Sequence, residues 1–222
     1  MGMSRKLEEL PLFLQSTVLF PYAQVQLHIF EDRYRQMVRD CVEDERPFGI
    51  VLARSTDDDG GEEPCLVGTT VRIVKVQNFD DGQMNIHVVG ERRFRIRKLD
   101  ETQPYLVGLV EPVIEMEIEP GPRGDALALK AREDFLLWMQ LLLGRPDFNV
   151  QVRFPDDSVA LSFTLANMLP IEEAEKQLLL ETTDTLDRLR RLIPHLENQL
   201  VSAPENLTRL GPDEVEGWIS RN

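Results

Sequence analysis

The amino-acid sequence predicts an α+β protein in which a β barrel with one inserted helix precedes a bundle of α-helices. Three observations support this fold class. Residues 10–119 contain short apolar stretches separated by turn residues, which is typical of strands. The proline- and glycine-rich segment Pro120–Gly124 then interrupts the pattern. Beyond it, apolar residues recur with a helical period to about residue 200.

Length and composition indicate a globular protein with a substantial core. The chain has 222 residues, of which 42% are hydrophobic and 29% charged. No apolar run approaches the roughly 20 residues that span a bilayer, and the N-terminus has no apolar signal core, so we expect a cytoplasmic protein without membrane contact. The net charge of -14 disfavours nucleic acid and favours basic or neutral partners, although such a charge is also a common solubility property.

The first part of the barrel contains the inserted helix. Strands are expected over residues 10–19 and 25–29, separated by the turn Phe20-Pro21-Tyr22. An amphipathic helix then follows and ends at Arg46-Pro47, with Glu31 and Asp32 in its first turn, where carboxylates favour the helix dipole. Its apolar stripe, which we expect to face the barrel, consists of Phe30, Tyr34, Met37, Val38, Cys41 and Val42.

The rest of the barrel is expected to be a series of strands. These cover residues 48–53, 67–79, 84–89, 94–98 and 105–119, with a hairpin turn at Asp80-Asp81-Gly82. Gly68 and Gly90 interrupt strand patterns and suggest bulges or close backbone approach in a partly open barrel. The acidic segment 55–64 does not match the ligand spacing of an EF-hand, so we interpret it as a solvated loop.

The second half is expected to be helical. One helix is marked by Ala128, Ala131, Phe135, Trp138 and Leu142, and further helices are expected over 158–168, over 171–180 and from about residue 183. Pro194 should kink or break the last of these. The predicted organisation is therefore a barrel domain over 1–119, a helical bundle over 123–202 and a polar tail over 203–222, with a short helix at 213–219.

Several spaced motifs occur in a fixed order along the chain. They are Phe20-Pro21, Phe30-Glu31-Asp32-Arg33-Tyr34-Arg35, Phe48-Gly49-Ile50-Val51-Leu52, Val67-Gly68-Thr69 and Val89-Gly90-Glu91-Arg92-Arg93-Phe94. Taken in this order, they resemble the N-terminal domain of the ATP-dependent Lon proteases. A helix over 158–168 that leads into Leu169-Pro170, followed by a helix containing Glu175-Lys176-Gln177, is similar to the same family. The resemblance covers about residues 8–200 and implies a PUA-like pseudo-barrel followed by a helical bundle.

The resemblance implies a binding module without catalytic activity. In the family, this domain helps to select unfolded or tagged protein substrates and supports oligomer assembly, and an ATPase module and a peptidase module follow it. Neither of these modules is expected within residues 1–222. The sequence contains no Gly-x-x-x-x-Gly-Lys-Ser/Thr loop and no serine in a glycine-rich turn with a lysine base. We therefore expect no enzyme and no cofactor. The expected partners are unfolded or tagged polypeptide, a protease or chaperone, or a second copy of the chain.

Two sets of residues are candidates for peptide binding. The outward face of the first helix carries Asp32, Arg33, Gln36 and Arg39, which could grip a peptide or could be an ordinary solvated face. The apolar segment 135–143, with Phe135, Trp138 and Met139, could form a groove for unfolded chains or a second subunit, or could be buried in the bundle.

Other functions have less support in the sequence. A basic cluster of Arg92, Arg93, Arg95, Arg97 and Lys98 would suit an RNA-binding PUA-like module, but neighbouring carboxylates favour local ion pairing. A cryptic hydrolase is a third alternative. Cys41 is expected to be a buried thiol, and Cys41 and Cys65 together form neither a metal motif nor a disulfide framework. The three histidines (His28, His87 and His195) are too scattered to predict a metal site.

Overall fold

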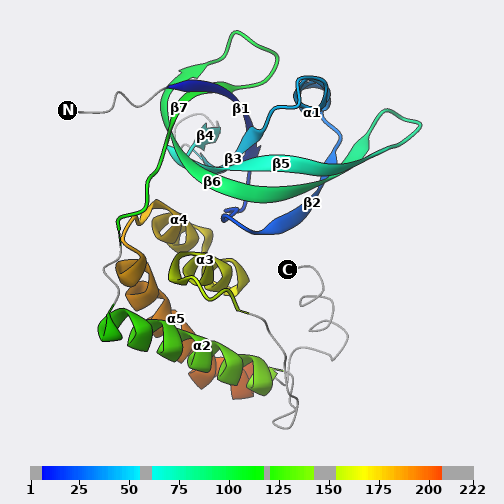
Figure 1. Cartoon of the computed structure of the whole chain (residues 1–222). Coiled ribbons are helices and arrows are strands. Elements are labelled where there is room, and N and C mark those ends of the chain that lie inside the picture. The colour runs from blue at the N-terminus through cyan, green and yellow to red at the C-terminus, as the bar shows by residue number, and fades with distance from the viewer. Residues whose placement is uncertain (1–6, 56–61, 118–120, 143–153, 207–222) are drawn as a thin grey trace, which may run out of the picture. The chain divides into compact units, whose positions relative to one another are not determined.

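The computed structural model describes residues 7–55, 62–117, 121–142 and 154–206 (Figure 1). These residues form two compact units. The barrel unit contains the described residues up to Ile114 together with Lys176–Glu181, and the helical unit contains the described residues of Glu115–Glu175 and those from Thr182 onward. The α+β fold class is confirmed, with strands gathered in the first unit and helices in the second.

Seven strands and one helix of the barrel unit lie within the described residues. In chain order they are β1 (Glu8–Gln15), β2 (Gln24–Ile29), α1 (Asp32–Glu43), β3 (Phe48–Ser55), β4 (Glu62–Pro64), β5 (Val67–Asn78), β6 (Met84–Asp100) and β7 (Val107–Pro112). The sheet has the order β1-β7-β6-β5-β3-β4, with β2 paired to β6. A parallel pairing of β1 with β3, in which Leu12 lies opposite Gly49, closes the strands into a ring. All other strand pairs are antiparallel.

The turn and glycine predictions agree with the structure. Gly82 has a φ of 80° in the turn between β5 and β6, a conformation that glycine adopts without steric cost. At Gly90 a Cβ atom would lie 2.4 Å from the carbonyl oxygen of Phe20, so only glycine allows this approach. Because Gly90 keeps an extended backbone, β6 continues through it as one strand, whereas the sequence suggested two.

Two other strands differ from the sequence predictions. β7 ends at Pro112, which cannot donate a ladder hydrogen bond, so it is shorter than the predicted 105–119. The strand Glu62–Pro64 lies in a segment predicted to be a loop, because it pairs with the end of β3. The remainder of that loop, residues 56–61, lies outside the described residues.

The second half of α4 (Glu173–Glu181) belongs to the barrel unit. Gln177 donates from Nε2 to the carbonyl oxygen of Val67 at 3.0 Å. Arg93 of β6 is buried and donates to the carbonyl oxygen of Leu180 at 2.5 Å. These two buried side chains tie the end of α4 to the barrel strands.

The helical unit contains α2 (Pro122–Leu142), α3 (Ser158–Met168), the start of α4 and α5 (Thr185–Asn206). Asp157 caps α3 by accepting a hydrogen bond from the backbone of Ala160, as its N-capping chemistry predicts. The α2 stripe of Ala128, Ala131, Phe135 and Trp138 is buried.

α5 differs from its prediction. The helix continues through Pro194, so the break that was one of the two expected effects of this proline does not occur, and it reaches Asn206 rather than ending near 202. Proline 194 is exposed, so its ring lies on the solvent side while the buried leucines on the other face hold the helix in place. The tail beyond residue 206, with its predicted helix at 213–219, lies outside the described residues. Among the residues that the structure describes, no helix has both the length and the apolar character needed to cross a membrane.

Candidate functional site

The outer face of α1 carries four of the predicted site residues. Asp32, Arg33, Gln36 and Arg39 are all exposed. Asp32 pairs with Arg35, and Arg33 pairs with Glu31. Gln36 and Arg39 have no hydrogen bond or ion pair within the described part of the chain. The four side chains therefore form an accessible polar surface, on which the Gln36 amide and the Arg39 guanidinium have no partner among the described residues.

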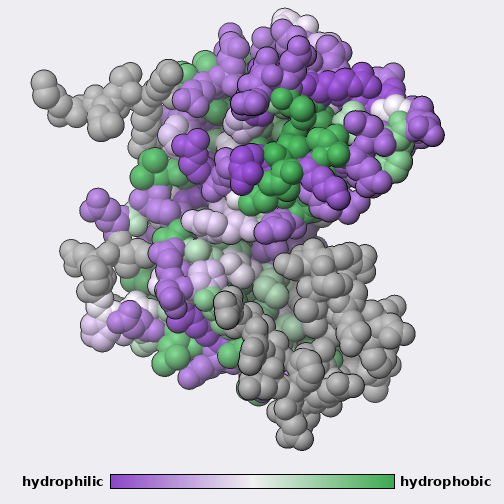
Figure 2. All heavy atoms as spheres, turned by 45° about the vertical axis from the view of Figure 1, so that its right-hand side comes forward, coloured by the Kyte–Doolittle hydropathy of each residue, from purple (hydrophilic) through white to green (hydrophobic). Residues whose placement is uncertain are grey.

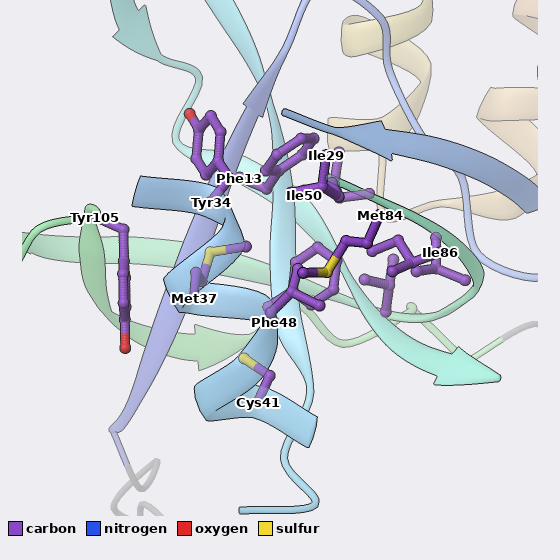
Figure 3. Packing of buried hydrophobic residues seen from close by; sticks show 13 residues of the cluster. Phe13, Ile29, Tyr34, Met37, Cys41, Phe48, Ile50, Met84, Ile86 and Tyr105 are labelled. Carbon is purple, nitrogen blue, oxygen red and sulfur yellow. The ribbon is translucent and has the colours of Figure 1, made fainter. Parts of the chain in front are cut away.

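The inner face of α1 packs into the core of the barrel (Figure 3). Tyr34, Met37, Val38 and Cys41 are buried against residues of β1, β3 and β6, as their helical spacing predicts. The prediction is wrong for two members of the stripe, which are not buried. Phe30 precedes the helix and is 60% exposed, and Val42 near the C-terminal end is 48% exposed.

A groove of about 490 Å³ lies between the end of α1 and β5. Its residues come from the last turn of α1, the following turn, β5 and one position of β6. They are Cys41, Val42, Glu45, Arg46, Pro47, Arg72, Ile73, Val74, Lys75, Val76 and Glu91. Val42 and Val74 are each about half exposed, at 48% and 50%, so the groove offers apolar surface to solvent. Figure 2 shows that hydrophobic residues gather on one face of the barrel unit within a border of hydrophilic ones.

Hydrogen bonds hold the α1 wall of the groove in position. The backbone N–H of Arg46 donates to the carbonyl oxygen of Cys41 at 3.0 Å, which closes the end of the helix. Tyr105 donates from its hydroxyl to Asp40 at 2.8 Å, and Arg46 lies 3.4 Å from the same hydroxyl oxygen. Burial and the bond to Asp40 raise the pKa of Tyr105 to about 12, so the phenol stays neutral and keeps its role as donor.

The β5 wall of the groove is a strand edge. β3 pairs with β5 only at residues 69–71, because Pro47 precedes the start of β3 at Phe48. From Arg72 to Asn78, β5 has β6 on one side. On the other side, no strand of the described chain is paired with it. The groove therefore runs beside unpaired backbone donors and acceptors, a feature that the sequence analysis missed.

Some of the charged groups around the groove form ion pairs and others do not. Arg72 pairs with Glu91 at 3.0 Å, and Arg46 lies 3.3 Å from Asp44. Lys75 on the β5 side and Glu45 on the α1 side have no ion-pair partner within the described residues. An occupant would thus meet one free ammonium group and one free carboxylate on opposite walls.

The second set of predicted site residues is buried and does not lie on the surface. Phe135, Trp138 and Met139 have exposed fractions of 0%, 2% and 1%. The Phe135 ring packs edge-on against Trp138 and Phe154, with ring centroids 5.4 and 5.7 Å apart. The three side chains form part of the packed interior, and the interpretation of this segment as an exposed groove is corrected accordingly.

The basic cluster of β6 is largely engaged in structural contacts. Arg93 is buried on the carbonyl oxygen of Leu180, and Arg97 pairs with Glu111 at 2.6 Å. Register shifts between β6 and its neighbours also break the alternation that would place these arginines on one face. Local pairing, the favoured interpretation of the cluster, agrees with these contacts.

The described residues hold no obvious catalytic or metal-binding constellation. No group of three histidine, cysteine or acidic side chains lies close enough to hold a metal ion in the described part of the structure. Burial raises the pKa of the Cys41 thiol to about 11, with Arg46 opposing the shift, and burial also raises the pKa of Cys65. Such thiols are poor nucleophiles at neutral pH. Ser162 is buried and donates to the carbonyl oxygen of Val159.

Comparison with known protein families shows to which family the chain belongs. The family model described as the ATP-dependent protease La (LON) substrate-binding domain matches residues 9–198. The chain belongs to the Lon substrate-binding domain family. The match extends over both units, from β1 into α5.

Relatives agree with this assignment. A Lon protease of Desulfovibrio desulfuricans is 26% identical over 207 residues, which are 90% of this chain and 24% of that protein. A LON peptidase N-terminal domain and RING finger protein of Schizosaccharomyces pombe is 28% identical, with 81% of this chain and 43% of that protein covered. The chain thus spans less than half the length of these relatives.

Solved structures show the same fold. The Lon N-terminal domain protein of Xanthomonas campestris matches with a TM-score of 0.63 and 29% identity, covering 84% of this chain and 98% of that one. The N-terminal domain of Lon protease from Mycobacterium avium complex matches with a TM-score of 0.67 at 24% identity, covering 86% and 99%. The PUA-like barrel followed by helices is therefore the fold of a Lon N-terminal domain.

Proposed function

We propose that this Lon-domain chain binds unfolded polypeptide reversibly and without ATP, as a recognition module in protein quality control. The observation that carries the proposal is the match of residues 9–198 to a substrate-binding domain family. One of the relatives is named a Lon protease, and the family model that matches this chain is described as the substrate-binding domain of an ATP-dependent protease.

The surface of the barrel unit supports this function. The exposed apolar side chains of Val42 and Val74 lie in a groove, and exposed apolar surface of this kind usually marks an interaction site. The outer face of α1 offers Gln36 and Arg39 as additional polar contacts. Unfolded chains present both apolar side chains and free backbone groups, which such a surface can engage.

Binding to a permanently unfolded model protein, measured by isothermal titration calorimetry with and without ATP, tests the proposal. We expect saturable binding with the same affinity in both conditions, because the proposed site uses no nucleotide. The absence of any interaction with unfolded protein at low and high salt would contradict the function. The folded form of the same model protein is the control and should bind at least about tenfold more weakly.

The contribution of the α1 face is tested by the double variant Gln36→Ala and Arg39→Ala. The matched control is Arg190→Ala with Asn198→Ala on α5, where both side chains are also exposed. We expect the α1 variant to weaken binding at least about threefold while the α5 variant binds normally. Equal affinities for both variants would remove these residues from the site.

A protease assay separates a binding module from the alternative of a cryptic hydrolase. We expect no digestion of casein by the purified chain, with or without ATP. Robust turnover that copurifies with the chain would overturn the assignment as a binding module.

A further inference from the structure

We propose that the unpaired edge of β5, residues 72–78, binds an extended segment of unfolded polypeptide as an added strand, with an acidic side chain of that segment placed against Lys75. The inference rests on the proposed function and names the form in which polypeptide is bound.

The geometry of the sheet provides the first argument. An antiparallel strand has hydrogen-bonding groups on both edges, and those of β5 beyond Val71 are used on the β6 side alone within the described structure. An edge of this kind is a template for a further strand. The groove occupies the place into which β3 would continue if it began before Phe48.

The groove provides the second argument, because it has room for side chains beside this edge. Ile73 and Val76 are partly buried against the barrel core, and Val42 and Pro47 form the opposite wall. Its volume of about 490 Å³ lies within the range of about 300–1,000 Å³ that is usual for ligand sites. An alternating segment could therefore place apolar side chains in the groove while its backbone pairs with β5.

A β-bulge limits the length of the added strand. Ile73 lies opposite Val88 and Lys75 lies opposite His87, so Val74 is an extra residue in β5. Bulges and edge lysines discourage indiscriminate pairing of exposed strands. We therefore infer that a short segment binds here rather than a long strand.

Charge selects the occupant. Pairing of β5 with β5 of a second copy would bring the cations Arg72 and Lys75 of both chains together, and like charges on adjacent strands are destabilising. A carboxylate in the incoming segment would instead satisfy Lys75, which has no ion-pair partner among the described residues. The favoured occupant is thus a different polypeptide with alternating apolar residues and one acidic residue.

Three fluorescein-labelled peptides test strand addition in the intact chain by fluorescence anisotropy. The first is a nine-residue peptide in which valine alternates with threonine and glutamate replaces the central threonine. The second has lysine at the centre, and the third is the glutamate peptide with alternate backbone nitrogens methylated on the edge that would pair. We expect the glutamate peptide to bind at least about threefold more tightly than the lysine peptide and about tenfold more tightly than the methylated one.

Two variants connect the binding to the groove. Lys75→Glu should weaken binding of the glutamate peptide about fivefold and strengthen binding of the lysine peptide. Val42→Asp should weaken binding of both peptides at least about tenfold, because it places a charge in the apolar groove. The matched control is Val201→Asp on α5, where the valine is 79% exposed and the change should leave binding unaltered. Circular dichroism of each variant verifies that the fold is retained.

The outcomes distinguish this inference from the function on which it rests. Strand addition would be overturned if the methylated peptide bound as tightly as the unmethylated glutamate peptide. It would also be overturned if Lys75→Glu changed the affinities for the glutamate and lysine peptides equally. Binding of unfolded protein without binding of any of the three peptides would also overturn it, while leaving the proposed function intact. If the native chain binds neither unfolded protein nor peptides, both proposals fail.

Discussion

Arg188 is the largest fully buried side chain of the described protein and lies in the helical unit. Its guanidinium donates to Ser162 at 2.8 Å, to the carbonyl oxygen of Thr182 at 2.5 Å, and to Thr185 and Glu115 at 3.1 Å each. It also lies 3.9 Å from the centre of the Phe163 ring. Burial lowers the pKa of Arg188, and the charge of Glu115 opposes this shift. One side chain therefore joins α3, α5 and the segment that precedes α2.

Replacement of Arg188 by alanine should destabilise the protein strongly. The change leaves Glu115 and several buried acceptors without their donor, and breaking a buried pair costs about 3 kcal/mol or more. Arg191→Ala is the matched control, because Arg191 pairs with Asp187 on the same helix but is 53% exposed. Urea denaturation should show a loss of less than about 0.5 kcal/mol for the control. Similar losses for the two variants would show that the buried network is not a major source of stability.

The Cys41 thiol should make the protein less stable at alkaline pH. Its pKa is raised from 9.0 to about 11, so the folded state holds the proton more tightly than the unfolded state. The resulting stabilisation is fully present below pH 9 and is lost as the pH rises through 11. The urea midpoint should therefore fall over this range, and it should fall less steeply in Cys41→Ala. Identical pH profiles for the two proteins would contradict the raised pKa.

At the scale of the elements, the strand and helix patterns were predicted well where local chemistry decides them. The Asp-Gly turn, the glycine contacts, the α3 cap and the buried face of α1 follow from short-range rules. Phe30 was placed on the wrong side because the helical period was extended one turn before the helix begins at Asp32. Pro194 was expected to kink or break α5, and the break does not occur because the packing of Leu189, Leu192 and Leu196 keeps the helix continuous.

The candidate site could be predicted only in part. The exposed positions on α1 follow from its period, since the same stripe that is buried defines the face that is not. The groove exists because β3 begins at Phe48, opposite Val71, and leaves the rest of β5 unpaired on that side. No local sequence pattern reveals this strand pairing. The burial of Arg188 was missed because an arginine in a helix usually lies on the solvent-exposed face. The available signal was its spacing of four residues from Leu192 and eight from Leu196, on the buried stripe.

Gly90 offers a test of the barrel at this scale. Gly90→Ala places a Cβ atom 2.4 Å from backbone oxygen of Phe20, which cannot move aside like a flexible side chain. We expect a loss of at least about 2 kcal/mol in the free energy of unfolding. Gly121→Ala is the control, because a Cβ atom there meets nothing within 4 Å. A Gly90→Ala protein as stable as the control would contradict the close approach of β6 to the segment between β1 and β2.

At the scale of the whole molecule, each unit has its own source of stability. The barrel unit is held by a closed ring of strands and by the core against α1. The helical unit is held by the buried stripes of α2 and α5 and by the contacts of Arg188 with α3 and Glu115. The proposed binding surface lies within the barrel unit alone. Substitutions at Arg188 that leave the barrel folded should therefore change stability more than peptide affinity.

Hydrogen–deuterium exchange of the whole chain, with and without a permanently unfolded protein, tests the central claim most directly. Added unfolded protein should slow amide exchange in residues 72–78 of β5, because their free N–H groups gain acceptors. Residues 24–29 of β2, which also pair with β6 alone in the described sheet, should exchange at an unchanged rate. An unchanged rate in β5 under saturating conditions, or slower exchange confined to α2 and α5, would contradict binding at the barrel groove.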